Sequence, residues 1–269
     1  MYGLFIDKSA TDSKSLLEYL SNWKQKNSLQ TQEYQIESVE DITAILKQNG
    51  SKFSTVVAIG DSDIFDTLIS EARLLDPNVA YSYVPTSKNI LSRRLGIKDY
   101  KDGFETVAQR KIVELTALSA NQQYFLFEYN LQAEFNKSQD PIKAIIKIDN
   151  NLEIKMSTHK LLVHNRNQEI TPHNSALLIE AFNKNLKSDQ SNNILKIPGL
   201  GIRSASNEDS LQLRLPAQSF LIESSQSMYN SSAKAMKNPI RIGLHKKIIR
   251  IIVKRGQEIQ AIISTGLIS

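Results

Sequence analysis

The stretch "VVAIGDSDIF", residues 56–65, decides how the chain is expected to fold. Its apolar run, residues 56–59, is typical of a buried strand, and the polar residues that follow predict a tight turn into a helix. Many enzymes hold a phosphate at such a junction, because free backbone amides and the positive end of the helix dipole face the anion. The turn has one glycine, Gly60, so only one position offers an unusually free backbone to a ligand.

The segments on either side repeat the alternation of strand and helix. "YGLFI" at 2–6 and "AYSYVP" at 80–85 predict strands, and residues 14–23 repeat apolar side chains at helical spacing. "SVEDITAILKQN" at 38–49 predicts a helix in which Ser38 and Asp41 form a capping box. Helices are also expected in "DIFDTLISEARLL" and "SKNILSRRLGI". Such alternation favours a parallel sheet covered on both faces, and we assign this α/β domain to residues 1–105.

Beyond Gly103 the pattern changes to short β-type runs separated by Asn, Asp, Ser, Gly and Pro. Examples are "IKAIIKI" at 142–148, "QSFLIES" at 218–224 and "KIIRIIV" at 247–253. This pattern is typical of an antiparallel sandwich or barrel, so residues 106–269 are predicted to form a β-rich, sandwich-like domain. One helix, "SALLIEAFNKNL" at 175–186, is expected to interrupt the strands.

Composition sets limits on compartment and chemistry. The 269 residues include no cysteine, which excludes disulfides, thiolate metal ligands and a cysteine nucleophile. No apolar run approaches the roughly 20 residues of a membrane span, and the first residues do not resemble a secretory signal, so a cytoplasmic protein is expected. There is no G-x-S-x-G elbow, P-loop or H-E-x-x-H motif to indicate a hydrolase, a P-loop enzyme or a zinc protease.

The net charge of +5 favours anionic partners without selecting one. The basic run "HKKIIRIIVKRG" at 245–256 suits either an anionic membrane surface or a core strand with solvated ends, and the core strand is the favoured interpretation. Nucleic acid is not expected as a partner, because no aromatic-rich basic motif is evident.

The segment "VPTSKNILSRRLGIKDYKDGFETV", residues 84–107, resembles the P-x-G-T-x-N-D-x-A-R-x-L-G-I motif of the diacylglycerol kinase catalytic-domain family. This family includes bacterial lipid kinases and sphingosine kinases and is structurally related to NAD kinases. The matching positions are Asn89, Arg93, Leu95, Gly96 and Ile97.

Two further stretches carry the same resemblance. Residues 59–63 fall on the family's G-G-D-G-T turn, of which Gly60 and Asp61 are retained. "NEDSLQL" at 207–213 resembles the D-D-G-x-L-D stretch through Asp209 and Leu211.

The resemblance implies an α/β nucleotide domain followed by a β-rich domain, with ATP and Mg²⁺ as cofactors and a lipid as phosphate acceptor. It assigns nucleotide binding to Gly60, Asp61, Ser62, Ser87 and Asn89, and it assigns Mg²⁺ to Asp61. A lipid or an anionic membrane surface is the implied partner, which would place the protein in the cytoplasm, at times peripheral to a membrane.

The sequence differs from the family motifs at the phosphate-binding turn and at the acidic catalytic element. Asp63 would set a carboxylate near the phosphates; at about 5 Å and an effective dielectric near 20 the repulsion is on the order of 3 kcal/mol, roughly a hundredfold in affinity. Alternatively, Asp63 is the N-cap of the following helix, which is the favoured interpretation. The family's acidic D-G-E element would fall in "NSSAKAMKNP" at 230–239, which has no carboxylate. Neither Asp209 nor Glu223 is expected to replace it.

Two functions remain open on this evidence. The first is a lipid kinase-like protein with degenerate motifs, in which phosphotransfer is weak or lost. The alternative is a non-catalytic scaffold that binds a lipid, an anionic ligand or a protein.

Overall fold

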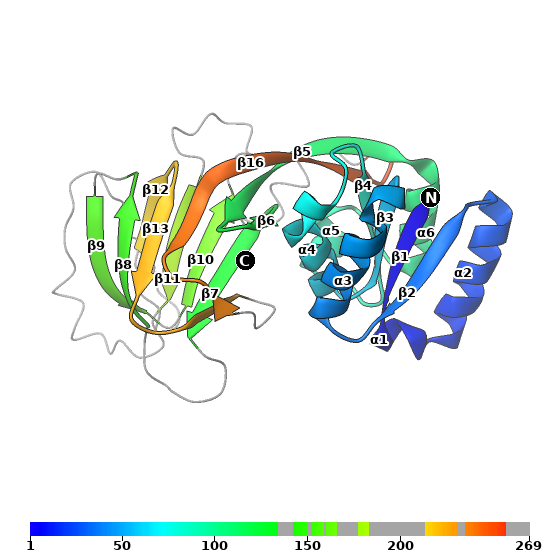
Figure 1. Cartoon of the computed structure of the whole chain (residues 1–269). Coiled ribbons are helices and arrows are strands. Elements are labelled where there is room, and N and C mark those ends of the chain that lie inside the picture. The colour runs from blue at the N-terminus through cyan, green and yellow to red at the C-terminus, as the bar shows by residue number, and fades with distance from the viewer. Residues whose placement is uncertain are drawn as a thin grey trace. The chain divides into compact units, whose positions relative to one another are not determined.

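The computed structural model describes residues 1–133, 142–149, 152–158, 160–165, 177–182, 213–230 and 235–256 (Figure 1). These residues fall into two compact units. The first unit holds residues 1–117 and 247–256. The second unit holds the described residues between 118 and 246. The chain therefore leaves the first unit and returns to it near its end. The division into an α/β domain at 1–105 and a β-rich domain at 106–269 stays a prediction.

The first unit is a parallel sheet with helices on both faces. Its strands lie in the order β2-β1-β3-β4-β16. They are β1 (Tyr2–Asp7), β2 (Thr31–Ile36), β3 (Thr55–Gly60), β4 (Ala80–Pro85) and the carboxyl-terminal part of β16 (Ile240–Val253). The helices are α1 (Lys8–Thr11), α2 (Lys14–Asn27), α3 (Val39–Asn49), α4 (Ser62–Ser70), α5 (Ile90–Arg94) and α6 (Tyr100–Gln109), with short 3₁₀ turns η1 (Gly50–Lys52) and η2 (Ala72–Leu74).

Burial explains why these strands are parallel and central. Every residue of β3 and β4 is buried, as expected for strands covered on both faces. On one face, Trp23 of α2 and Phe104 of α6 pack with their rings 5.1 Å apart over Val57 and Ile59. On the other, α4 packs on β3 and α3 packs on α4. The predicted α/β fold of this region is confirmed.

The helix starts follow local chemistry. The Ser13 hydroxyl accepts a hydrogen bond from the Leu16 backbone N–H (3.4 Å), so Ser13 caps α2. The Asp41 carboxylate accepts from the backbone N–H groups of Ser38 (2.8 Å) and Glu37 (3.1 Å) at the start of α3. These backbone hydrogen bonds hold the pKa of Asp41 below its ordinary value. The predicted capping box of Ser38 and Asp41 is confirmed.

Strand β16 differs from its prediction. The run at 247–253 was expected in the antiparallel domain, yet Arg250 and Ile251 pair in parallel with Ala80 and Tyr81 of β4. The residues at 251–253 are fully buried. A continuous apolar run is typical of a strand that is covered on both faces, whereas a strand with one face in solvent alternates apolar and polar residues. Strand β2, which alternates exposed and half-buried positions before Ile36, was not predicted.

The second unit is built from two antiparallel sheets. In one the order is β16-β13-β8-β9, and β5 pairs with β6 and β16; in the other it is β12-β11-β10-β7-β14-β15. The strands are the last residues of β5 (Lys111–Ala120), which begins in the first unit, and β6 (Gln123–Phe125), β7 (Glu128–Ala133), β8 (Ile142–Ile148), β9 (Leu152–Thr158), β10 (Lys160–Asn165), β11 (Leu177–Phe182), β12 (Leu213–Ala217), β13 (Phe220–Ser224), β14 (Met228–Asn230) and β15 (Ala235–Met236).

One apolar core is shared by the two sheets. It includes Ile146 of β8, Ile222 of β13, Leu131 of β7 and Val163 of β10. The predicted antiparallel, sandwich-like architecture is therefore confirmed.

The helix predicted at 175–186 is wrong where the structure describes it. Residues 177–182 form β11, which pairs with β10 on one edge and with β12 on the other. Hydrogen bonding along both edges outweighs the helical spacing of the apolar residues, because strand formation depends on neighbours more than on local preference.

None of the helices in the described ranges has the length and apolar character needed to span a membrane.

Candidate functional site

The candidate site lies between the carboxyl ends of β1 and β3. Strand β1 pairs with β2 on one side and with β3 on the other. The connection after β1 leads to β2, and the connection after β3 leads in the opposite direction, to β4. Ligands of open α/β sheets bind at such switch points, outside the carboxyl ends of the strands. Asp7 ends β1 and Gly60 ends β3, so these two residues flank the crevice.

Gly60 is required by the packing of this crevice. Its φ is +141°, a conformation that side chains disfavour, and a Cβ added to it would lie 2.3 Å from the Asp7 Cβ. The glycine therefore lets the Asp7 side chain lie directly against the β3 backbone. This role is structural and would hold with or without a ligand.

Helix α4 begins two residues earlier than expected. Asp61, with φ −78° and ψ 163°, is the N-cap of α4, while Ser62 and Asp63 are the first residues of the helix. The prediction that Asp63 is the N-cap is wrong, because the chain has already turned at Gly60 and Asp61 is the last residue with extended backbone. The Asp61 side chain makes no capping hydrogen bond, which leaves its exposed carboxylate facing solvent.

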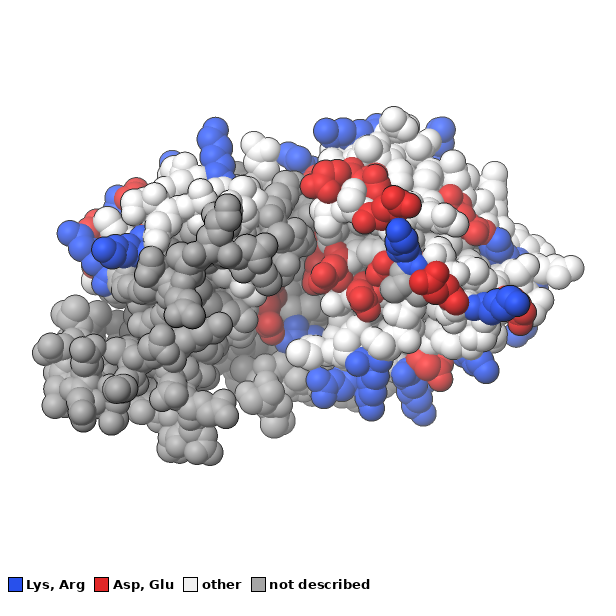
Figure 2. Space-filling model, turned by 90° about the horizontal axis from the view of Figure 1, so that it is seen from below, with Lys and Arg blue, Asp and Glu red and all other residues white. Residues whose placement is uncertain are grey.

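Carboxylates surround this turn. Partial burial, followed by the charges of Asp61 and Asp7, raises the pKa of Asp63 above its ordinary value. Figure 2 looks onto the end of the parallel sheet where β1 runs into α1, and acidic side chains gather there. The local field therefore favours cations and opposes a bare polyphosphate. Among the described residues, no group of three or more His, Cys, Asp or Glu side chains is arranged to hold a metal ion.

A buried tyrosine joins two of the predicted residues. The Tyr83 hydroxyl donates to the Gly60 carbonyl (2.9 Å) and accepts a hydrogen bond from the Asn89 side-chain amide (2.6 Å). Asn89 in turn accepts from the Ser92 backbone N–H (2.8 Å) and caps α5. Ser87, also predicted, lies exposed between β4 and α5 at the same edge of the sheet. Tyr83 was not predicted, since a tyrosine inside an apolar strand reads as a core residue.

We expect Tyr83→Phe to lower the free energy of unfolding by about 1.5 kcal/mol, because it leaves the Gly60 carbonyl and the Asn89 amide without this buried partner. Tyr81→Phe is the matched control. Tyr81 is also buried, and its hydroxyl has no hydrogen-bond partner among the described atoms, so its removal is expected to be neutral or stabilising. Urea denaturation of both variants checks this, and equal losses would contradict it.

The sequence analysis named two further acidic residues, Glu223 and Asp209. Glu223 lies in β13 of the second unit and pairs with Lys147 (3.1 Å), in agreement with its predicted place in a strand. Asp209 and Leu211 lie outside the described residues.

Three basic side chains of the run 245–256 contact the first unit itself. Lys247 donates to the Ala72 carbonyl, Arg250 donates to the Asn78 carbonyl (2.8 Å), and Lys254 forms an ion pair with Asp102 (2.7 Å). These contacts favour the interpretation of the run as a core strand.

The comparison with solved structures supports the expected architecture. The chain is similar to a diacylglycerol kinase from Bacillus anthracis strain Sterne, with a TM-score of 0.66, 14% identity and coverage of 96% of this chain and 98% of the other. It is also similar to an NAD kinase from Archaeoglobus fulgidus in complex with ATP (TM-score 0.53, 10% identity, 96% and 95% coverage). Yeast NADH kinase complexed with NADH gives a TM-score of 0.56 at 11% identity, with 100% and 88% coverage.

No family model matches the chain, and no curated protein shows significant sequence similarity to it. At such low identities the structural likeness establishes the fold. The chain therefore has the fold of diacylglycerol kinases and NAD kinases, as the resemblance at residues 59–63 and 84–107 predicted.

Proposed function

We propose that this chain is a lipid kinase-like protein whose nucleotide site is weak and whose phosphotransfer to a lipid is weak or lost. The fold shared with a diacylglycerol kinase and with an NAD kinase complexed with ATP supports the kinase-like part. The acidic residues at the turn support the proposal that nucleotide binding is weak. Asp61 and Asp63 lie at the start of α4, and the Asp7 side chain lies against Gly60.

The residues at the turn fit a magnesium-bound nucleotide better than a nucleotide alone. The first amides of α4, at Ser62 and Asp63, have no partner within the helix and would donate to a phosphate. The exposed Asp61 carboxylate is a hard oxygen ligand of the kind Mg²⁺ prefers, alongside waters and phosphate oxygens. Mg²⁺ would neutralise phosphate charge that the neighbouring carboxylates otherwise oppose. Asn89 and Ser87 would line the other side of the nucleotide.

Phosphotransfer also needs a group that orients or deprotonates the acceptor hydroxyl. The segment expected to supply it, residues 230–239, has no carboxylate. A general base contributes on the order of 10² to 10⁴ in rate, so its absence leaves little activity.

Calorimetry with MgATP tests the proposal. We expect millimolar binding by the wild-type protein, and no measurable heat from Asp61→Ala. Asp76→Ala is the matched control, because Asp76 is an exposed aspartate that precedes β4, at the amino edge of the parallel sheet and so opposite the turn after β3. Thermal melting of each variant separates a binding defect from misfolding.

A second assay measures the transfer of radiolabelled phosphate from ATP to diacylglycerol or to sphingosine. Micromolar MgATP affinity together with Asp61-dependent phosphorylation of either lipid would show that the site is fully active and contradict the proposal. If several millimolar MgATP gives no heat in the wild type, the nucleotide site is excluded and the non-catalytic scaffold is the better description.

A further inference from the structure

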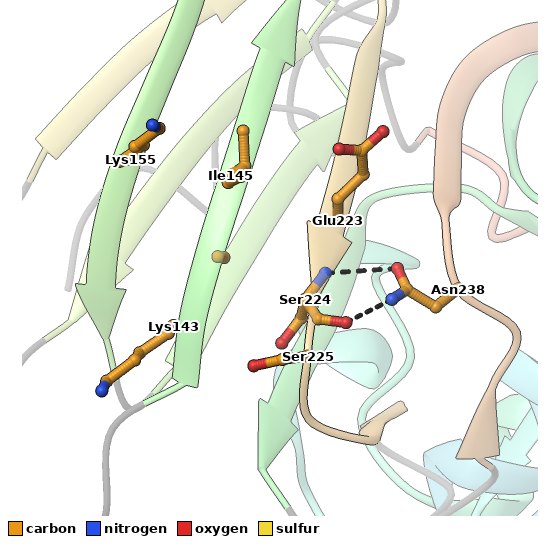
Figure 3. Close-up of a pocket in the computed structure, with 8 residues that line it drawn as sticks. Lys143, Ile145, Lys155, Glu223, Ser224, Ser225 and Asn238 are labelled. Atoms are coloured by element: carbon orange, nitrogen blue, oxygen red, sulfur yellow. Dashed lines mark hydrogen bonds between the residues drawn. The ribbon is translucent and has the colours of Figure 1, made fainter.

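The second unit has a pocket of about 570 Å³ on its β13-β8-β9 sheet (Figure 3). Its polar lining comes from Lys143 of β8, Lys155 of β9, Glu223 and Ser224 of β13, Ser225 and Asn238. None of these residues was singled out as a ligand contact by the sequence motifs, and the pocket shares no lining residue with the turn at Gly60.

The strand register explains why these side chains share one face. Ile145 pairs with Lys155 on one side and with Glu223 on the other, and directly paired residues point to the same face of a sheet. The neighbours Ala144 and Ile146 point into the core, so Ile145 and its partners point away from it. Lys143 lies two residues along from Ile145, which makes it a diagonal neighbour of Lys155 at about 7 Å.

The pocket carries unbalanced positive charge. The Glu223 carboxylate already pairs with Lys147 (3.1 Å). Within the described part of the chain, neither the Lys143 nor the Lys155 ammonium has an acidic partner or a hydrogen bond to its Nζ. Like charges at diagonal positions repel, and an anion held between them would remove that repulsion.

The side of the pocket near Ser225 is held in place by hydrogen bonds. The Asn238 side chain accepts from the Ser224 backbone N–H (3.3 Å) and donates to the Ser224 carbonyl, as Figure 3 shows. The Lys143 backbone N–H donates to the Gln226 side chain (2.9 Å), which fixes the turn after β13. The exposed Ser225 hydroxyl sits on this turn. A rigid rim reduces the ordering that a ligand must induce on binding.

We propose that this pocket binds a phosphate monoester carried on a small hydroxylated group. Two ammonium groups on one face match a dianion, whereas a carboxylate needs only one of them. The Glu223 carboxylate would accept hydrogen bonds from hydroxyls of the carrier, and Ser225 lies at the rim to contact it. Such a ligand is either a soluble phosphate ester or the head group of a phospholipid. The proposal is independent of the nucleotide site.

The test uses the full chain without ATP or Mg²⁺, so its result does not depend on the proposed kinase-like function. Calorimetry is run with sn-glycerol 3-phosphate, glycerol and inorganic phosphate, and sedimentation with phosphatidic acid vesicles and phosphatidylcholine vesicles. The variant Lys143→Gln/Lys155→Gln removes both ammonium groups. The control Lys14→Gln/Lys47→Gln removes the same net charge from exposed positions on α2 and α3 of the first unit.

We expect wild-type and control proteins to bind glycerol 3-phosphate, and the pocket variant to bind at least tenfold more weakly with an unchanged melting temperature. Binding to phosphatidic acid vesicles that is lost in the same variant identifies the head group as the source of the phosphate. Binding of glycerol 3-phosphate alone identifies a soluble ester. Absence of binding of every phosphate probe by the wild type, or equal loss in the control variant, overturns the proposal.

Discussion

Replacement of Gly60 by alanine is expected to lower the free energy of unfolding by about 4 kcal/mol. Two costs add at this position. A residue with a side chain is strained at φ +141°, and the new Cβ would lie 2.3 Å from the Asp7 Cβ, a separation that requires one of the two strands to move. Both strands are buried, so neither can move without disturbing the core. Urea denaturation at neutral pH measures the effect.

Gly256→Ala is the matched control for backbone strain. Gly256 also has a positive φ, +84°, but a Cβ there would meet no atom within 4 Å. This variant should cost about 1 kcal/mol, the strain term alone.

The clash itself is isolated by a double-mutant cycle with Asp7→Gly. Removing the Asp7 side chain should recover part of the loss caused by Gly60→Ala, because the atom that the new Cβ meets is gone. A Gly60→Ala variant as stable as Gly256→Ala, or a cycle with no coupling, would show that the crevice is looser than the structure indicates.

Where the sequence predicted the fold well, the signals were local. The capping box of Ser38 and Asp41 lies within four residues, and the apolar strand at 56–59 runs directly into its helix. The return of β16 to the parallel sheet could not be predicted in this way. Its pairing joins Arg250 to Ala80, and an apolar run by itself fits either sheet. The same limit explains β11, whose two neighbours are distant segments of the chain.

In the candidate site, too, some residues could be predicted from the sequence and others could not. The resemblance selected Gly60 and Asn89, and the structure brings them together. It did not select Tyr83, which links them, or Asp7, which lies against Gly60. Neither has a sequence signal of its own, since one reads as a core residue and the other as the polar end of a strand. Their roles depend on which strands are neighbours.

Asp63→Asn is expected to tighten MgATP binding between about fivefold and a hundredfold. A carboxylate about 5 Å from a phosphate oxygen costs about 3 kcal/mol at an effective dielectric of 20 and about 1 kcal/mol in water. Asp63 is only partly buried and keeps contact with solvent, so the effect lies below the upper limit. Asparagine keeps the size and hydrogen-bonding reach of the side chain. Calorimetry at pH 7 compares it with Asp76→Asn, which changes an exposed aspartate at the amino edge of the parallel sheet.

The pH dependence identifies the charge as the cause. Because burial and the carboxylates of Asp61 and Asp7 raise the pKa of Asp63, the folded protein retains this proton to a higher pH than the unfolded chain does. Protonated Asp63 therefore contributes its full share to the free energy of unfolding at pH values below the ordinary aspartate pKa. This contribution is lost as the pH rises through the raised pKa of Asp63 in the folded protein. The advantage of Asp63→Asn in both stability and MgATP affinity should therefore shrink as pH falls through that range. If the variant binds MgATP more weakly than the wild type at pH 7, Asp63 is a ligand of the magnesium ion, and the acidic turn is part of a working site.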